Sequence, residues 1–325
     1  FCCFISIFVS LKMAEAMIDM RGTFAESERE CENGFFQKGP FWHLYTPGVI
    51  NEIIFRNRED FEFGMNLTGV LAEMFPMIRI ITFELMSNHV HFILSGEEIH
   101  CQTFFGKFKS RLQRYFRECG SAVCLDRFTP TLTSIQTLQA LRNEIVYVNR
   151  NGYVANSNCT PYSYYWGAGF LYFNPMVFDL DGVRFCDLKY REKRKILRSR
   201  LQDVDFNLTV RNGIVLPSSY CYVREGELYY RDAHHYFNLL SKSNEAMSQI
   251  AKNLGDQISV TDEEMYSIAS NLSNRLYSVR QPSLVANQQK VELAKKLHYD
   301  YNATKKQLRR ILRLDLSVLN ELFPG

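Results

Sequence analysis

The sequence lacks the paired-cysteine spacing that marks disulfide scaffolds and zinc knuckles. Its 325 residues include nine cysteines, an odd number, at irregular spacings and with no C-x-x-C. Neither a disulfide framework nor a cysteine-rich zinc site is therefore expected, and the thiols are predicted to be reduced, as in an intracellular protein.

Long hydrophobic runs are also missing. Residues 1–12, FCCFISIFVSLK, are apolar over about 11 positions, which is too short to span a bilayer, and no basic segment precedes them as in a signal peptide. The chain does not begin with Met, so we expect the native start at Met13, Met17 or Met20, with residues 1–38 forming a poorly ordered lead-in. No membrane partner is predicted.

A strong net charge is absent as well, since the formal charge is only +3. Hydrophobic residues make up 46% and charged residues 22% of the chain, which is ordinary for a soluble globular protein with a sizeable core. The length suits two domains, or one domain with long appendages. Local blocks of basic residues are therefore more informative than the total charge.

Alternating and helical patterns predict an α+β domain over residues 39–158. The expected elements are a strand at 41–46, a helix at 57–75, a strand hairpin at 78–86 and 90–95, and helices at 103–120 and 134–151. This order predicts an antiparallel sheet with helices on one face. Residues 159–244 lack a clean period and are expected to be a linker and irregular region, with short strands near Pro217.

The pair His89 and His91 is the first candidate for chemistry. Side chains two positions apart in a strand point to the same face, so the two imidazoles should project together. Two nitrogen ligands placed in this way can hold one divalent metal ion. The alternative is that each ring hydrogen-bonds a backbone carbonyl in a half-buried sheet.

The helix predicted at 134–151 supplies the second candidate. Its apolar residues lie on one broad arc, and they are Ile135, Leu138, Leu141, Ile145, Val146 and Val148. Tyr147 lies on the opposite side with Glu144 and Asn151, where a core-filling tyrosine would not be placed. If this helix packs beside the sheet, Tyr147 and Asn151 can both approach the histidine pair. The alternative is an ordinary surface tyrosine.

Two motifs together resemble a known family. MSNHVHFIL (86–94) resembles the His-hydrophobe-His motif of the HUH single-tyrosine transposases, and YVNRNGYV (147–154) is similar to the tyrosine helix of their REP-associated tyrosine transposase branch. The separation of the two motifs fits that family, as do FWHLYTPG, IFRNREDFEFGM and the DRF that precedes the tyrosine helix. The likeness covers about residues 40–158. Gly152 is a departure, because the family often has Pro there.

The resemblance implies the ferredoxin/RRM-like antiparallel sheet of the HUH nucleases and an α-helical C-terminal domain. It also implies a metal-dependent endonuclease or transposase that cleaves and rejoins single-stranded DNA near hairpins through a 5′-phosphotyrosine. Tyr147 would be the nucleophile, His89 and His91 would be metal ligands, and Asn151 would be the third ligand. The metal would be Mg²⁺ or Mn²⁺, of which Mn²⁺ suits two nitrogen ligands better.

Two other readings of the same residues stay open. One is a catalytically inactive DNA-binding or regulatory protein that keeps the transposase fold, and the other is a metal-dependent hydrolase with no covalent step. In each DNA-binding case the expected partner is single-stranded or hairpin DNA, the expected location is the cytoplasm in association with the nucleoid, and the chain acts as a monomer or a homodimer.

Basic residues on two predicted helices are candidates for DNA contacts. The helix at 103–120 offers Lys107, Lys109, Arg111, Arg114 and Arg117, and the resemblance adds Arg127. Residues 245–325 are predicted to form a helical domain in which about 287–314, with Thr304 as N-cap, suit a helix-turn-helix for duplex DNA. The second of its helices offers Lys305, Lys306, Arg309 and Arg310. The alternative for both helices is a simply solvated basic face.

Overall fold

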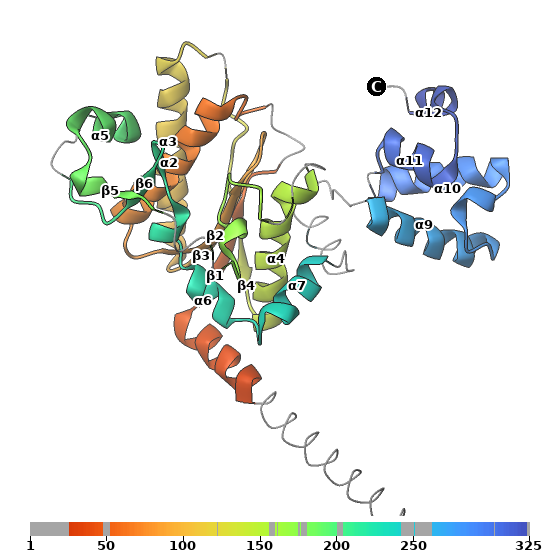
Figure 1. Cartoon of the computed structure of the whole chain (residues 1–325), viewed down its shortest axis with the longest axis horizontal. Coiled ribbons are helices and arrows are strands. Elements are labelled where there is room, and N and C mark those ends of the chain that lie inside the picture. Colours follow the sequence, from red (N-terminus) through yellow and green to blue (C-terminus); the bar gives the residue numbers. More distant parts are fainter. Residues whose placement is uncertain are drawn as a thin grey trace, which may run out of the picture.

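The computed structural model of the chain (Figure 1) describes most of the residues beyond the first 25. The described ranges are 26–47, 53–121, 123–155, 160, 162–174, 176, 181–199, 204–241, 250, 262–301 and 303–323. The expected native start at Met13, Met17 or Met20 lies outside them. None of the described helices is long and apolar enough to cross a membrane.

A four-stranded antiparallel sheet forms the centre of the first part. Its strands are β1 (Phe41–Tyr45), β2 (Arg79–Leu85), β3 (Val90–Ser95) and β4 (Thr131–Ile135), in the order β2-β3-β1-β4. Helix α2 (Arg58–Met74) connects β1 to β2, and α3 (Glu98–Glu118) connects β3 to β4. The predicted α+β class is therefore confirmed, and the connectivity is the βαββαβ of ferredoxin-like sheets.

Strand β4 corrects the predicted start of the last helix. The sequence suggests a helix from residue 134, whereas β4 ends at Ile135 and α4 spans Leu138–Ala155. The segment TLTSI is short and polar, and its strand form depends on pairing along the whole length of β1, far away in the sequence. Thr137 then accepts a hydrogen bond from Ala140 N at 3.1 Å, which satisfies a free amide at the start of α4.

Helices cover both faces of the sheet, so the prediction of helices on one face is wrong. Phe92 of β3 contacts Phe104 and Phe108 of α3, with ring centroids 5.5 and 5.6 Å apart. His91, the preceding residue, points the other way and lies 5.7 Å from the ring of Tyr147 in α4. Figure 1 accordingly shows α2 and α3 on one side of the sheet and α4 on the other.

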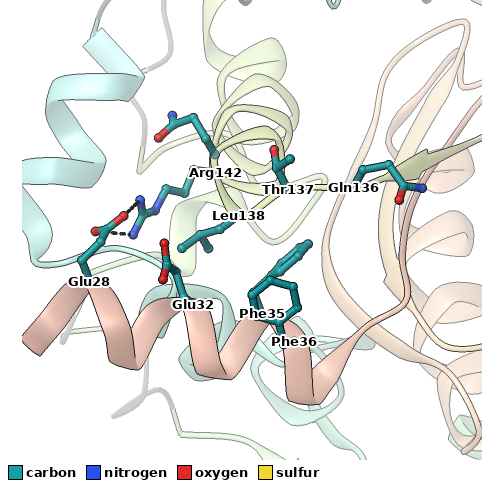
Figure 2. Close-up of a pocket in the computed structure, with 9 residues that line it drawn as sticks. Glu28, Glu32, Phe35, Phe36, Gln136, Thr137, Leu138 and Arg142 are labelled. Carbon is teal, nitrogen blue, oxygen red and sulfur yellow. Dashed lines mark hydrogen bonds and ion pairs between the residues drawn. The ribbon is translucent and has the colours of Figure 1, made fainter.

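Part of the expected lead-in is ordered. Residues 1–25 lie outside the described ranges, but 26–38 form a helix that buries Cys31 and Phe35, one turn apart, in the first core. Figure 2 shows how Glu28 of this helix reaches Arg142 of α4, with contacts of 2.6 and 3.0 Å. The two helices border an open pocket of about 290 Å³, and Glu32 and Gln136 are among the residues that line it.

Residues expected to be a linker instead join the first core. Trp166 O accepts a hydrogen bond from Leu85 N at 2.7 Å, and Ala168 N donates to Phe83 O at 2.9 Å, so this stretch pairs with the edge strand β2. Tyr172 is fully buried and donates its hydroxyl to Ile81 O. The aromatic residues without a period are therefore packing residues that cover a sheet edge and α4.

Several short elements lie within this covering region. They are η1 (Gly169–Leu171), β5 (Val183–Arg184), η3 (Phe185–Asp187), α5 (Tyr190–Leu197), β6 (Thr209–Arg211), β7 (Ile214–Val215), η4 (Pro217–Ser219), α6 (Val223–Leu228) and α7 (Ala233–Ser241). The short strands predicted near Pro217 are β6 and β7, which join β5 in a second, three-stranded sheet. The basic run that follows residue 190 forms α5.

The C-terminal part is helical, as predicted, and has a hydrophobic core of its own. It contains α9 (Asp262–Tyr277), η5 (Pro282–Leu284), α10 (Asn287–Tyr301), α11 (Lys305–Leu312) and α12 (Leu316–Leu322). Thr304 caps α11 as predicted, since it accepts from Gln307 N at 3.2 Å while the Gln307 side chain accepts from Thr304 N at 2.9 Å. Three residues separate α10 from α11.

Candidate active site

The two histidines of the HVH motif lie together, as the strand period predicts. His91 is fully buried in β3, and His89, at the end of the hairpin turn, is 8% exposed. Their rings are 4.9 Å apart between centroids and nearly perpendicular. Met86 N donates to His89 O at 2.9 Å, and this hydrogen bond closes the hairpin turn next to the pair.

Helix α4 presents Glu144, Tyr147 and Asn151 to this face of the sheet. The three residues are spaced three and four positions apart and therefore form one stripe along the helix. Tyr147 lies 5.7 Å from His91 between ring centroids, and Asn151 Nδ2 lies 3.4 Å from His91 Nε2. Tyr147 is only 4% exposed, so it is not an ordinary surface tyrosine. The predicted approach of this stripe to the histidine pair is thus present.

The sequence reasoning missed His43, which belongs to the same cluster. It lies in β1 on the face of His91, is fully buried, and places Nε2 at 3.0 Å from His91 Nδ1. Its other nitrogen, Nδ1, lies 2.7 Å from Glu144 Oε2. Tyr45, two residues further along β1, is directly opposite His91 and stacks on it at 6.2 Å. The pattern His43-x-Tyr45 in a predicted strand was the available signal, but only the strand register joins it to the histidine pair.

Glu84 is a second group that the sequence did not identify. It is 1% exposed and directly opposite His91 in the β2–β3 ladder. A Cβ atom on Gly152 would lie 2.2 Å from Glu84 Oε2 and 2.1 Å from Cδ1 of Tyr164. The departure at Gly152 therefore has a packing reason: the missing side chain leaves room for a buried carboxylate and an aromatic ring.

The donor set at the cluster fits a hard or intermediate divalent ion. Nδ1 of His89 contacts Asn88 Oδ1 at 2.7 Å and Nδ1 of His91 contacts His43, so in both rings Nε2 is the nitrogen suited to coordination. A half-turn of the Asn151 amide would bring its oxygen to the position of Nδ2. Among the described residues, no three His, Cys, Asp or Glu side chains are grouped to hold a metal ion. For a metal ion held by His89 and His91, the Asn151 amide is the candidate third protein ligand.

The predicted basic face on α3 is only partly available for DNA. Arg111 is half-buried and donates to Leu197 O at 3.2 Å, and burial together with the positive charge of Arg114 lowers the pKa of its guanidinium. Arg114 is bound to Glu118 at 2.8 Å. Lys107 and Arg117 are exposed and Lys109 is half-exposed.

The position of α3 limits what these side chains can reach. Phe104 and Phe108 of α3 pack on the sheet face opposite His91, so the helix and the histidine cluster are separated by the sheet. Arg127 is exposed in the loop before β4. The prediction that α3 contacts DNA is untested by this geometry, but the contact would not be made beside Tyr147.

The predicted basic face of the C-terminal helix pair is exposed. Lys306, Arg309 and Arg310 are open to solvent on α11, while Leu308, Ile311 and Leu312 on its other side are buried in the second core. Lys305 is half-buried, and its Nζ lies 3.2 Å from Asn320 Oδ1. Three of the four predicted residues thus form a solvent-exposed positive stripe.

No protein-family model, no curated protein and no solved structure matches the chain.

Proposed function

We propose that the chain is a metal-dependent single-stranded DNA endonuclease or transposase of the HUH type, acting near hairpins through a 5′-phosphotyrosine. The observation that carries the proposal is the convergence of Tyr147, Asn151 and the two histidines from separate elements onto one face of a βαββαβ sheet. A packing tyrosine alone would not require two buried imidazoles and an amide around it.

In the proposed reaction Tyr147 Oη attacks a backbone phosphorus of the DNA. The phenol loses its proton as a bond forms between Oη and phosphorus, the bond from phosphorus to the 3′ oxygen breaks, and that oxygen takes up a proton, so the strand leaves with a 3′-hydroxyl. The covalent phosphotyrosine conserves the energy of the cut bond, so the reverse attack can rejoin DNA. His89, His91 and Asn151 would hold Mg²⁺ or Mn²⁺, which when bound offsets the negative charge that develops on the phosphate.

The burial of Tyr147, taken alone, favours the alternative of a non-catalytic DNA-binding protein. A nucleophile that is 4% exposed reaches DNA only if neighbouring groups move aside, whereas a non-catalytic DNA-binding protein needs no such movement. The catalytic assignment is preferred because a buried tyrosine in a purely structural role does not need to face two potential metal ligands.

The test is covalent adduct formation with single-stranded hairpin oligonucleotides in the presence of Mn²⁺, observed on a denaturing gel. Tyr147→Phe should abolish the adduct and retain DNA binding, because only the nucleophilic oxygen is removed. Tyr45→Phe is the matched control, since Tyr45 is equally buried and also contacts His91. This control should keep the adduct.

Each remaining outcome supports a different assignment for the chain. An adduct that persists in Tyr147→Phe and disappears in Tyr45→Phe would move the nucleophile to Tyr45. Cleavage without any adduct would indicate a hydrolase with no covalent step. Binding without cleavage in the wild-type chain would indicate the DNA-binding alternative.

A second DNA contact is part of the proposal. The exposed stripe Lys306, Arg309 and Arg310 lies on α11, which begins three residues after α10 ends, a spacing typical of the helix-turn-helix whose second helix enters the major groove. We therefore propose that the C-terminal helices bind duplex DNA while the cluster around Tyr147 acts on the single strand.

A further inference from the structure

His43 joins the candidate site to a carboxylate through an unbroken chain of hydrogen bonds. Glu144 Oε2 lies 2.7 Å from His43 Nδ1, and His43 Nε2 lies 3.0 Å from His91 Nδ1. Asn151 Nδ2 continues the line at 3.4 Å from His91 Nε2. Both rings are fully buried, and Glu144 is only 14% exposed, so water does not compete freely for these bonds.

With a neutral His43, the carboxylate at the end of the chain sets the direction of the hydrogen bonds that follow it. An ionised carboxylate can only accept, so His43 Nδ1 must carry the hydrogen. The Nε2 atom of a neutral His43 then has a lone pair and must accept, which puts the next hydrogen on His91 Nδ1. His91 Nε2 is left with a lone pair, directed at the amide hydrogen of Asn151.

His89 also has an acceptor at its Nδ1, supplied by a different partner. His89 Nδ1 lies 2.7 Å from Asn88 Oδ1, an acceptor, so the hydrogen of this ring is also on Nδ1. In both rings Nδ1 is thus the nitrogen that carries the hydrogen, and Nε2 is the nitrogen with the lone pair. A set of packing histidines has no reason to share one tautomer, but a pair of metal ligands does.

We propose that Glu144 and His43 are positioning residues that hold His91 in the Nδ1–H tautomer, with Nε2 as the ligating atom. The inference rests on the proposed function and adds to it two residues that contact neither the DNA nor the metal. Glu144 lies one turn before Tyr147 on α4, so the same helix supplies the reacting oxygen and the anchor of the ligand. A shift of α4 would therefore disturb the nucleophile and the ligand together.

The tautomer can be measured on the full chain without metal. The sequence has seven histidines, so selective ¹⁵N labelling of histidine gives few signals, and His43→Gln and His91→Gln assign the two of interest. In the wild type we expect a protonated Nδ1 and an unprotonated Nε2 for His91. Finding the hydrogen on Nε2 would overturn the proposal, whatever the activity of the protein.

Substitutions at Glu144 then test whether the tautomer matters for the metal. Glu144→Ala should give His91 a mixture of tautomers and weaken Mn²⁺ binding, measured by calorimetry, by about 10- to 100-fold. Glu144→Gln keeps an acceptor oxygen for His43 Nδ1 and should restore both the tautomer and most of the affinity. Asn143→Ala is the matched control, because Asn143 is the neighbouring residue on α4 and accepts only from Gln139 among the hydrogen bonds described.

The outcomes separate this inference from the proposed function. Unchanged Mn²⁺ affinity and unchanged His91 signals in Glu144→Ala, or no Mn²⁺ binding by the wild type, would overturn the positioning role. If the tautomer and the Mn²⁺ effect are as expected but no DNA adduct forms, the positioning role holds and the nuclease proposal fails. If the adduct forms in a protein with the opposite tautomer, the nuclease proposal holds and the positioning role fails.

Discussion

At the scale of single residues, Gly152 shows how a missing side chain can be a requirement of packing. It lies in α4 one residue after Asn151, and its hydrogen faces the Glu84 carboxylate and the Tyr164 ring. Glu84 is opposite His91 in the candidate site, and Tyr164 is held in place by donating to Leu85 O at 2.7 Å. A change at this glycine should therefore affect both stability and the site.

Gly152→Ala is expected to lower the free energy of unfolding by about 1–3 kcal/mol, because its Cβ would overlap backbone-anchored groups that cannot move far. Urea denaturation followed by tryptophan fluorescence measures the change. Gly106→Ala is the matched control: Gly106 is also helical, a Cβ there meets nothing within 4 Å, and alanine should be neutral or stabilising by about 0.5–1 kcal/mol. Equal stability of the two variants would contradict the packing explanation.

At the scale of elements, the helix of residues 26–38 is tied to α4 by an ion pair, in addition to the packing of Cys31 and Phe35 in the first core. Arg142 is 3% exposed at its side chain and is held by both carboxylate oxygens of Glu28. Burial acts to lower the pKa of Arg142, and the hydrogen bonds and charge of Glu28 more than reverse this effect. The hydrogen bond to Arg142 in turn lowers the pKa of Glu28 below its ordinary value of 4.5.

The lowered pKa of Glu28 predicts a stability that depends on pH. A carboxyl group whose pKa is depressed by folding stabilises the native state above its unfolded pKa, and this contribution is lost as pH falls through the folded pKa. The difference in urea midpoint between the wild type and Glu28→Gln should therefore be constant above about pH 5.5 and shrink below about pH 4.5. Glu32→Gln, an exposed acid one turn away, should show no such pH dependence.

Substitutions of the basic residues on α3 are predicted to have different effects, although the sequence pattern groups these residues together. Lys107→Ala, Lys109→Ala and Arg117→Ala combined should weaken single-stranded DNA binding and reduce its dependence on salt, because these side chains reach solvent. Arg111→Ala should instead lower the stability of the fold, since Arg111 is bound to Leu197 O beneath α5. Fluorescence anisotropy at several salt concentrations measures the first effect, and denaturant unfolding measures the second. Similar binding losses from Arg111→Ala alone would show that its guanidinium is available to DNA.

At the scale of the whole molecule, the described residues form two hydrophobic cores that share no residue. One contains the sheet with its helices and the covering segment, and the other contains α9 to α12. Figure 1 shows the second group as a bundle of its own. The only two tryptophans, Trp42 and Trp166, belong to the first core, so their fluorescence reports on that part alone.

Leu297→Ala should therefore destabilise only the C-terminal bundle, by about 2–5 kcal/mol, because Leu297 is fully buried there. The helical signal in circular dichroism should lose part of its amplitude at lower temperature while the tryptophan transition stays in place. Leu141→Ala, fully buried in the first core, should shift the tryptophan transition. A single transition that moves equally in both variants would mean that the two cores unfold as one unit.

The sequence by itself determined the features that depend on neighbours within one element. The period of two in HVH, the spacing of Glu144, Tyr147 and Asn151, and the cap at Thr304 are local, so they were readable before any fold was known. Only the tertiary structure decided which strands and helices lie side by side and which of their faces are in contact. The register of β1 against β3 brings His43 to His91, and the pairing of β4 with β1 makes a strand of polar residues.

The same distinction between local and tertiary contacts explains the covering region. Residues 162–174 and 204–241 have no period of their own because they are shaped by the sheet edge and by α4 rather than by a repeating local environment. A sequence pattern records the environment of each element only when that environment repeats along the element. Contacts between distant segments have no such repeat. The packing role of Gly152 and the positions of Glu84 and His43 beside His91 could therefore be recognised only in the folded chain.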